Sequence, residues 1–178
     1  VDIPVLVKNP INPDLQLWLG SMERVNKVGI KRLGAIHRGF SSYEKSKYRN
    51  KPMWEFPIEL RRLYPNMPII VDPSHICGSR ELIPSVAQKA LDLDFDGLMI
   101  ESHRDPDNAW SDAAQQVTPE RLGEIISSLI VRSSKLDNFA ENQLESLRAQ
   151  IDRIDNYFLE IMGERMDIAR KIGEFKRD

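Results

Sequence analysis

Residues 68–80 read PIIVDPSHICGSR, and residues 96–116 read DGLMIESHRDPDNAWSDAAQQ. Each stretch begins with a short apolar run, at 69–71 and 98–100, that is typical of a strand buried on both faces. Each run leads into a residue that can bind a metal, His75 in the first stretch and Glu101 in the second, and Asp112 follows in a polar loop. One imidazole and two carboxylates suit a borderline divalent ion such as Mn, Fe, Co or Zn.

The spacing of these three residues favours a shared site. His75 and Glu101 are separated by about one βα unit, which would bring them to the same rim of a parallel sheet. Taken singly, His75 could be an ordinary turn residue and Asp112 an ordinary helix cap. The common rim adds support to the metal-binding interpretation, and spacing alone leaves these alternatives open.

The whole N-terminal part alternates between strand and helix patterns. Strands are expected to start near residues 3, 33, 68 and 97, and helices are expected over about 15–28, 54–63, 82–91 and 119–132. This alternation predicts a parallel α/β sheet, with Lys8 and Arg38 at the ends of the first two strands. Four units cannot close an eight-stranded barrel, and periodicity alone leaves open half a barrel or an open sheet.

Composition narrows the class of protein. The chain has 178 residues, enough for one ordinary domain and an appendage, and its net charge of -2 gives no support for a nucleic-acid partner. No apolar run approaches the length of a membrane span, and no signal-peptide pattern opens the chain. The single cysteine excludes an internal disulfide and fits a reducing cytoplasm. Because the chain begins at Val1 and ends within a helical pattern, we expect it to be a piece of a longer protein.

The motifs DPSH, DGLMIESH and SD followed by QQ-x-TP resemble the last two strands of the DAHP synthases, and the resemblance spans roughly residues 3–130. It implies that residues 1–132 are the C-terminal half of a TIM (β/α)8 barrel. The implied reaction is the condensation of phosphoenolpyruvate with erythrose 4-phosphate, the first step of the shikimate pathway of aromatic amino acid biosynthesis. KDO 8-phosphate synthase, which performs a similar aldol-type condensation, is the alternative within the same superfamily.

The resemblance also implies roles for individual residues. His75, Glu101 and Asp112 match the family's metal ligands, with His75 also expected among the catalytic residues. The family's fourth ligand is a cysteine on a strand that this chain does not contain. Cys77 does not match that position and is expected to be structural.

Two basic residues match the family's phosphoenolpyruvate site. Lys8, in the sequence KNP, and Arg38, in RGF, resemble its enolpyruvate-binding lysine and arginine, and Lys8 is also expected to take part in proton transfer. The alternative for both is a solvated charge at the start of a loop. The neighbouring His37 is expected to have only a supporting or loop role.

The C-terminal part has a different pattern. Apolar residues recur at steps of three and four, as in a heptad seam, at Leu144, Leu147, Ile151, Ile154, Phe158, Ile161, Ile168, Ile172 and Phe175. Such a seam is typical of a dimerisation helix or coiled coil. Arg165 interrupts it, and a buried unpaired guanidinium would cost roughly several kcal/mol, so we expect Arg165 to meet an anion. Lys176 lies on nearly the same helix face, about 16 Å further along.

Residues 144–178 resemble the first helix of the all-α chorismate mutases, which are intertwined dimers. Arg148, Arg165 and Lys176 match that family's chorismate- and prephenate-binding positions, with Arg148 supplied by the partner subunit. The resemblance implies a bifunctional homo-oligomer in which residues 133–143 link synthase to mutase. The alternative is a non-catalytic truncated piece whose helix only dimerises.

Overall fold

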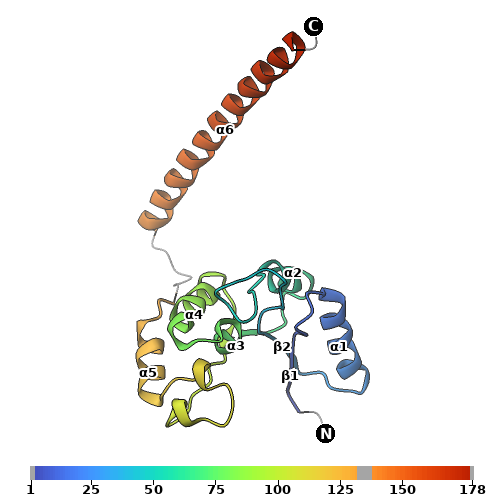
Figure 1. Cartoon of the computed structure of the whole chain (residues 1–178), viewed down its shortest axis with the longest axis vertical. Helices are drawn as coiled ribbons and strands as arrows, with labels where there is room; N and C mark the ends of the chain where they lie inside the picture. Colours follow the sequence, from blue (N-terminus) through green and yellow to red (C-terminus); the bar gives the residue numbers. More distant parts are fainter. Residues whose placement is uncertain (1–2, 132–137, 177–178) are drawn as a thin grey trace. The chain divides into compact units, whose positions relative to one another are not determined.

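The computed structural model describes residues 3–131 and 138–176. The chain divides into two compact units, one up to Arg132 and one from Ser133. Among the described residues, the first unit contains the four strands and every helix except the last (Figure 1). The elements in order are β1 (Val5–Lys8), α1 (Leu15–Lys27), β2 (Leu33–His37), α2 (Glu55–Leu63), β3 (Ile69–Val71), α3 (Pro73–Cys77), η1 (Arg80–Leu82), α4 (Ile83–Asp92), β4 (Gly97–Leu98), η2 (Pro106–Asn108), η3 (Ala113–Gln115), α5 (Pro119–Ser128) and α6 (Asn138–Phe175).

The four strands form one parallel sheet in the order β1-β2-β3-β4. Lys8 pairs with Ile36, Ile36 with Ile70, and Ile70 with Gly97, so these residues form one row across the sheet. Each strand joins the next through a helical crossover, and the strand order never reverses. A doubly wound sheet changes direction in its strand order, whereas a barrel does not. The structure therefore favours the half-barrel over the open doubly wound sheet.

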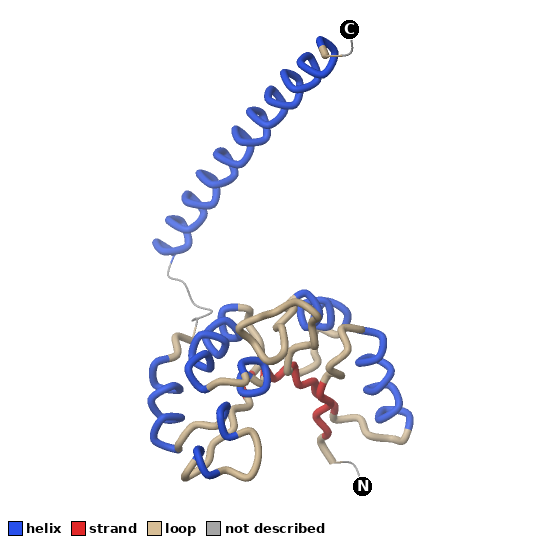
Figure 2. The backbone as a smooth tube through the Cα atoms, in the orientation of Figure 1, coloured by secondary structure: helices blue, strands red, loops and turns tan. Residues whose placement is uncertain are grey.

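The helices of this unit cover one face of the sheet. Val7, Ala35, Ile69 and Val71 belong to a single apolar cluster that also includes Trp18 of α1 and Leu60, Ile83 and Ile125 of α2, α4 and α5. The alternate strand residues face the other way, and Leu6 among them is 48% exposed. Figure 2 shows the helices as an arc around the strands, as in the outer ring of a barrel.

A local signal sets the start of the first helix, whereas two later elements end earlier than the sequence predicts. Asp14 caps α1, its carboxylate accepting hydrogen bonds from the backbone of Gln16 and Leu17 at 2.8 and 3.2 Å. The fourth strand is shorter than the apolar run at 98–100 predicts, since regular pairing ends at Leu98. The last helix of the unit also ends before the expected residue 132, at Ser128, because the chain turns extended and the Ile130 amide binds the Gln88 side chain.

The second unit consists of α6, whose described residues run from Asn138 to Phe175. The helix begins inside the segment 133–143 that the sequence predicts as a linker, and the part of that segment up to residue 137 lies outside the described residues. From Leu147 onward the apolar side chains of the seam are exposed, for example Phe158 at 62% and Ile168 at 59%. No helix within 3–131 or 138–176 is both long enough and apolar enough to cross a membrane.

Candidate functional site

His75 lies in the short helix α3 directly after β3, rather than at the strand end itself. Asp72 caps this helix by accepting a hydrogen bond from the His75 amide at 3.0 Å, and Pro73 occupies its first turn. The Asp72 Oδ2 atom also lies 2.9 Å from His75 Nδ1, although the two are poorly aligned for a hydrogen bond. The other ring nitrogen, Nε2, faces Glu101 Oε1 at 3.7 Å.

Glu101 follows β4 and is fixed at both ends. Its amide donates to the Ser74 hydroxyl of α3 at 3.0 Å, and its Oε2 atom accepts from Gln115 Nε2 at 2.9 Å. The loop after Glu101 then returns to its own start, because the Val117 amide donates to the Glu101 carbonyl at 3.1 Å. This closure carries Asp112 back to the rim on which Glu101 lies.

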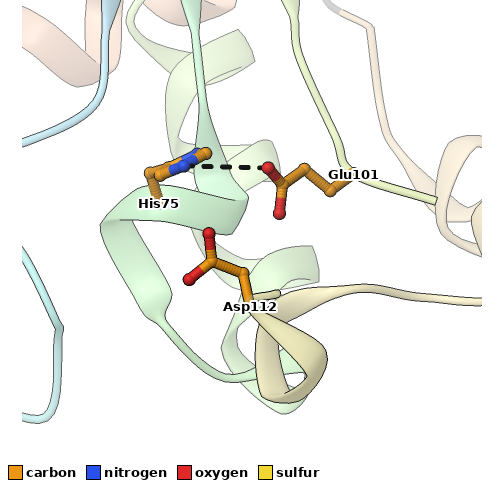
Figure 3. A group of neighbouring side chains, drawn as sticks. All are labelled: His75, Glu101 and Asp112. Carbon is orange, nitrogen blue, oxygen red and sulfur yellow. Dashed lines mark ion pairs between the residues drawn. The ribbon is translucent and has the colours of Figure 1, made fainter. Parts of the chain in front are cut away.

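Asp112 precedes the turn η3 with a positive φ of 50°, and it provides no cap to that turn through its side chain. Its Oδ1 accepts a hydrogen bond from Arg49 Nη1 at 2.6 Å, and this guanidinium holds the pKa of Asp112 below its ordinary value. His75, Glu101 and Asp112 each offer a ligand atom within 4.8 Å of the others. Their side chains face one another in Figure 3. The grouping combines one nitrogen and two oxygen donors, so it fits a divalent ion of the transition series.

Lys8 is connected to this grouping through Asp72. Its ammonium group donates to Asp72 Oδ2 at 2.8 Å, the same oxygen that faces His75, and the Asp72 side chain is fully buried. A buried carboxylate needs such partners because desolvation otherwise disfavours its charged form. The Lys8 side chain keeps a third of its surface exposed, which leaves it accessible to a ligand.

Arg38 follows β2 and is positioned by Asn9, the residue after Lys8. The Asn9 Oδ1 atom accepts from the Arg38 amide at 2.7 Å, while its Nδ2 donates to the Gly39 carbonyl at 2.8 Å. Asn9 thus holds the ends of β1 and β2 together. The Arg38 Nε atom is buried and has no hydrogen-bond partner among the described residues, so an anion binding there would satisfy it.

Two residues near the rim have structural roles. Cys77 is buried, and burial raises the pKa of its thiol to about 12, which makes it a poor ligand compared with a thiolate. Of the supporting or loop role expected for His37, the structure excludes the loop, because His37 is the fully buried end of β2 and is surrounded by the rings of Trp18, Phe40 and Trp54. Burial lowers the pKa of His37 to about 4, so it is neutral at pH 7.

Three further residues belong to the site that the sequence interpretation does not identify. Asp72 connects Lys8 with His75, Gln115 contacts Glu101, and Arg49 contacts Asp112. The position of Asp72 carried a usable signal, since an acid before proline at a strand end is typical of a helix cap. Arg49 carried none, because it lies in a loop with several other basic residues.

Of the expected ligand positions of the second unit, Arg148 and Arg165 lie on α6 and Lys176 directly follows its end. Arg148, Arg165 and Lys176 are exposed. The helical rise separates Arg165 from Lys176 by about 16 Å and from Arg148 by about 25 Å. A small dicarboxylate therefore cannot reach both Arg148 and Arg165 on one copy of this helix.

Comparison with known proteins gives matches for both units. The model of the DAHP synthetase I family matches residues 1–136, and the model of chorismate mutase type II matches residues 147–178. The second match lies entirely in the C-terminal unit. The two parts therefore occur in the order that the sequence resemblances imply.

Among curated proteins, the chain is 29% identical over 126 residues to phospho-2-dehydro-3-deoxyheptonate aldolase of Thermotoga maritima, a match covering 71% of this chain and 37% of the relative. It is 37% identical over 68 residues to 2-dehydro-3-deoxyphosphooctonate aldolase of Bordetella pertussis, covering 37% of this chain and 24% of that protein. Among solved structures, a truncated form of 3-deoxy-D-arabino-heptulosonate 7-phosphate synthase from Thermotoga maritima matches with a TM-score of 0.65 and 28% identity, covering 71% of this chain and 47% of that one.

The chain thus spans little more than a third of the first curated relative and about a quarter of the second. The structural match to the synthase confirms the α/β fold class, half of a TIM barrel. Because the family model covers most of the chain, including every strand and the candidate metal ligands, the fold and the comparison agree. The chain belongs to the DAHP synthetase I family.

Proposed function

We propose that the whole protein condenses phosphoenolpyruvate with erythrose 4-phosphate, and that this chain supplies half of the active site. The observation that carries the proposal is the meeting of His75, Glu101 and Asp112 within 4.8 Å at the rim where β3 and β4 end. Catalytic groups gather at this rim in α/β barrels. The product would be DAHP, the first intermediate of the shikimate pathway.

In this proposal His75, Glu101 and Asp112 bind a divalent ion, which can be Mn, Fe, Co or Zn. The bound ion supplies Lewis acidity toward the aldehyde carbonyl. The Asp72 carboxylate lies beside Nδ1 of His75 while Nε2 faces Glu101, and a carboxylate beside the second ring nitrogen is common around metal-binding histidines. His75 thereby acts in catalysis as a ligand.

Lys8 and Arg38 bind phosphoenolpyruvate, which carries a carboxylate and a phosphate and so needs fixed cations. Support comes from the exposed third of the Lys8 side chain and from the unsatisfied Nε of Arg38. Lys8 is also the proposed proton-transfer group, since its ammonium lies one carboxylate away from His75. The remaining contacts to the sugar phosphate would come from other parts of the protein.

The experiment uses the full-length protein, stripped of metal with a chelator and reloaded with Mn²⁺, Co²⁺, Zn²⁺ or Fe²⁺ in turn. Consumption of phosphoenolpyruvate is followed with erythrose 4-phosphate and, separately, with arabinose 5-phosphate, the aldehyde of the KDO 8-phosphate alternative. We expect turnover with erythrose 4-phosphate, loss on stripping, and no turnover by His75→Ala or Glu101→Ala. Preference for arabinose 5-phosphate would instead support the octulosonate activity named for the Bordetella relative. Full turnover by the stripped variants would contradict the ligand assignment.

For the C-terminal unit we propose a contribution to chorismate mutase chemistry or to prephenate binding, within a cytoplasmic homo-oligomer. The apolar seam of α6 is exposed on the described chain and needs a partner, and the chorismate mutase match supports this part of the proposal. Arg165 and Lys176 would bind one chorismate or prephenate molecule, with Arg148 coming from a second copy because it lies about 25 Å away.

The test is conversion of chorismate to prephenate by the full-length protein, compared with Arg165→Ala and with Arg170→Ala. Arg170 already pairs with Asp167 on the same helix and serves as the matched control. We expect loss only in the Arg165 variant. Oligomers in sedimentation without conversion or prephenate binding would instead favour the non-catalytic dimerising helix.

A further inference from the structure

The residues Arg49 and Asn50, in the loop between β2 and α2, hold the end of the helix that carries His75. The amides of Arg49 and Asn50 donate to the carbonyls of Cys77 and Ile76 at 3.2 and 3.1 Å, and Asn50 Nδ2 donates to the His75 carbonyl at 2.8 Å. The last carbonyls of a helix have no partner within it, and α3 is only five residues long. The loop therefore supplies the partners that α3 cannot provide for itself.

Arg49 is also held close to α3 by the shape of the following turn. Gly78 ends the helix at a φ of 66°, and a Cβ built there would lie 2.5 Å from the Cβ of Arg49. The absence of a side chain at Gly78 thus makes room for the stem of Arg49. With both its backbone and its stem fixed, the guanidinium reaches the rim from a defined direction.

From that position one nitrogen of Arg49 contacts two acceptors. Nη1 donates to Asp112 Oδ1 at 2.6 Å and to Gln115 Oε1 at 2.8 Å, and Gln115 Nε2 donates in turn to Glu101 Oε2 at 2.9 Å. Gln115 is 1% exposed, so its amide cannot exchange these partners for water. Because Arg49 is a donor only, it fixes the amide with its oxygen toward Arg49 and its nitrogen toward Glu101.

This chain of hydrogen bonds uses one oxygen of each carboxylate and leaves the other for an ion. On Glu101 the oxygen that Gln115 does not occupy is Oε1, the atom that faces His75 Nε2. On Asp112 the oxygen that Arg49 does not occupy is Oδ2. One side chain therefore sets the orientation of both carboxylates, while the adjacent Asn50 holds the helix of the imidazole.

We propose that Arg49, acting through Asp112 and through Gln115, is a positioning residue that preorganises the three metal ligands. The proposal rests on the proposed function in one respect, the assignment of His75, Glu101 and Asp112 as ligands. Arg49 itself does not touch the ion. It removes the orientational freedom of two carboxylates before the ion binds. Less ordering is then needed on binding, so the protein binds the ion more tightly.

The experiment measures the dissociation constant for Mn²⁺ in the full-length protein, by competition with a chromophoric chelator. The variants are Arg49→Gln, Arg49→Lys and Gln115→Met, with Lys51→Gln as the matched control. Lys51 is two residues away, carries the same charge and pairs with Glu44 at 2.6 Å rather than with the rim. We expect Arg49→Gln and Gln115→Met to bind Mn²⁺ roughly 10- to 100-fold more weakly, and the control to match the wild type.

Further readouts separate positioning from folding. Thermal unfolding in excess chelator should be similar for all variants, and the visible spectrum of the Co²⁺-loaded protein should change only in the Arg49 and Gln115 variants. Arg49→Lys keeps the charge but replaces the planar, preorganised guanidinium with an ammonium on a flexible stem, so it should also bind Mn²⁺ more weakly than wild type. If the Arg49 variants fold poorly, Gln115→Met still tests the proposal alone.

The outcomes distinguish this proposal from the proposed function. Wild-type Mn²⁺ affinity and an unchanged Co²⁺ spectrum in Arg49→Gln and Gln115→Met would overturn the positioning role, while condensation activity would stand. Weakened binding in a protein that performs no condensation would support the positioning role and reject the activity. A wild-type protein that binds no divalent ion would overturn both.

Discussion

Replacement of the buried His37 should change how stability depends on pH. Burial lowers the pKa of His37 from 6.5 to about 4. As the pH falls, the unfolded chain takes up a proton near 6.5, but the folded chain does so only near 4. The unfolded state therefore binds more protons across this window, and the free energy of unfolding decreases as pH falls. At about 1.4 kcal/mol for each pH unit, the loss that His37 causes is about 3 kcal/mol between pH 6.5 and pH 4.

The assay is urea unfolding of the metal-free full-length protein at several pH values from 7.5 to 4.5. Tryptophan fluorescence reports on the relevant region, because Trp18 and Trp54 have ring centroids 6.3 and 5.4 Å from that of His37. We compare the wild type with His37→Gln and with His103→Gln, a histidine outside this aromatic cluster. The His37 variant should be less stable at pH 7.5 but should lose less stability toward pH 4.5.

The decisive quantity is the difference in slope between variants, since carboxylates elsewhere titrate equally in all three proteins. A slope for His37→Gln that is parallel to the wild type throughout the window would refute the reasoning. An equal flattening in His103→Gln would refute it as well, because the effect would then not come from burial at His37.

Three further predictions concern the same unit. Asp72→Asn, which removes the carboxylate facing Lys8, should weaken Mn²⁺ binding by roughly tenfold or more in chelator competition. The control Asp14→Asn, which alters the cap of α1, should leave the Mn²⁺ affinity unchanged. Equal Mn²⁺ affinities in the two variants would contradict the role of Asp72. Gly39→Ala places a Cβ 2.8 Å from a backbone oxygen at a φ of 75°, so urea unfolding should show a loss of at least about 1–2 kcal/mol. The control Gly123→Ala, which places its Cβ in open space on α5, should not be destabilising. Equal losses of unfolding free energy in the Gly39 and Gly123 variants would exclude a steric clash as the cause. Because the pKa of Cys77 is raised to about 12, iodoacetamide at pH 8 should label Cys77 slowly in the native protein and rapidly in urea. Mass spectrometry of the peptide that contains Cys77 measures the two rates. Equal labelling rates in the native and unfolded protein would show an accessible thiolate.

The parallel fold was predictable because its signals are local. The strands at Val5–Lys8, Leu33–His37 and Ile69–Val71 are short apolar runs bounded by turn residues, and the structure confirms them nearly to the residue. The ends of the last strand and last helix of the unit were not predictable, since both depend on pairing with distant residues. Gln88, for example, receives the Ile130 amide across 42 positions of the chain.

The rim was predictable in part, for a related reason. His75 and Glu101 come a few residues after β3 and β4, so sheet topology brings them to one rim, and closure of the loop at Val117 returns Asp112 to the same rim. Arg49, which contacts Asp112 and Gln115, does not follow a strand. Arg49 is 63 positions from Asp112, and nothing in the basic loop around it distinguishes it from Lys47 or Lys51. Only the folded loop shows which of these cations contacts a carboxylate.

The Asp72 carboxylate couples the proposed metal binding at His75 to the proposed anion binding at Lys8. A single oxygen atom, Oδ2, faces the ammonium of Lys8 on one side and the imidazole of His75 on the other. Electron density drawn toward one neighbour is less available to the other. In the proposed site, a metal ion bound at His75 would therefore alter the affinity of Lys8 for an anion, and the bound anion would alter the affinity for the metal ion by the same factor.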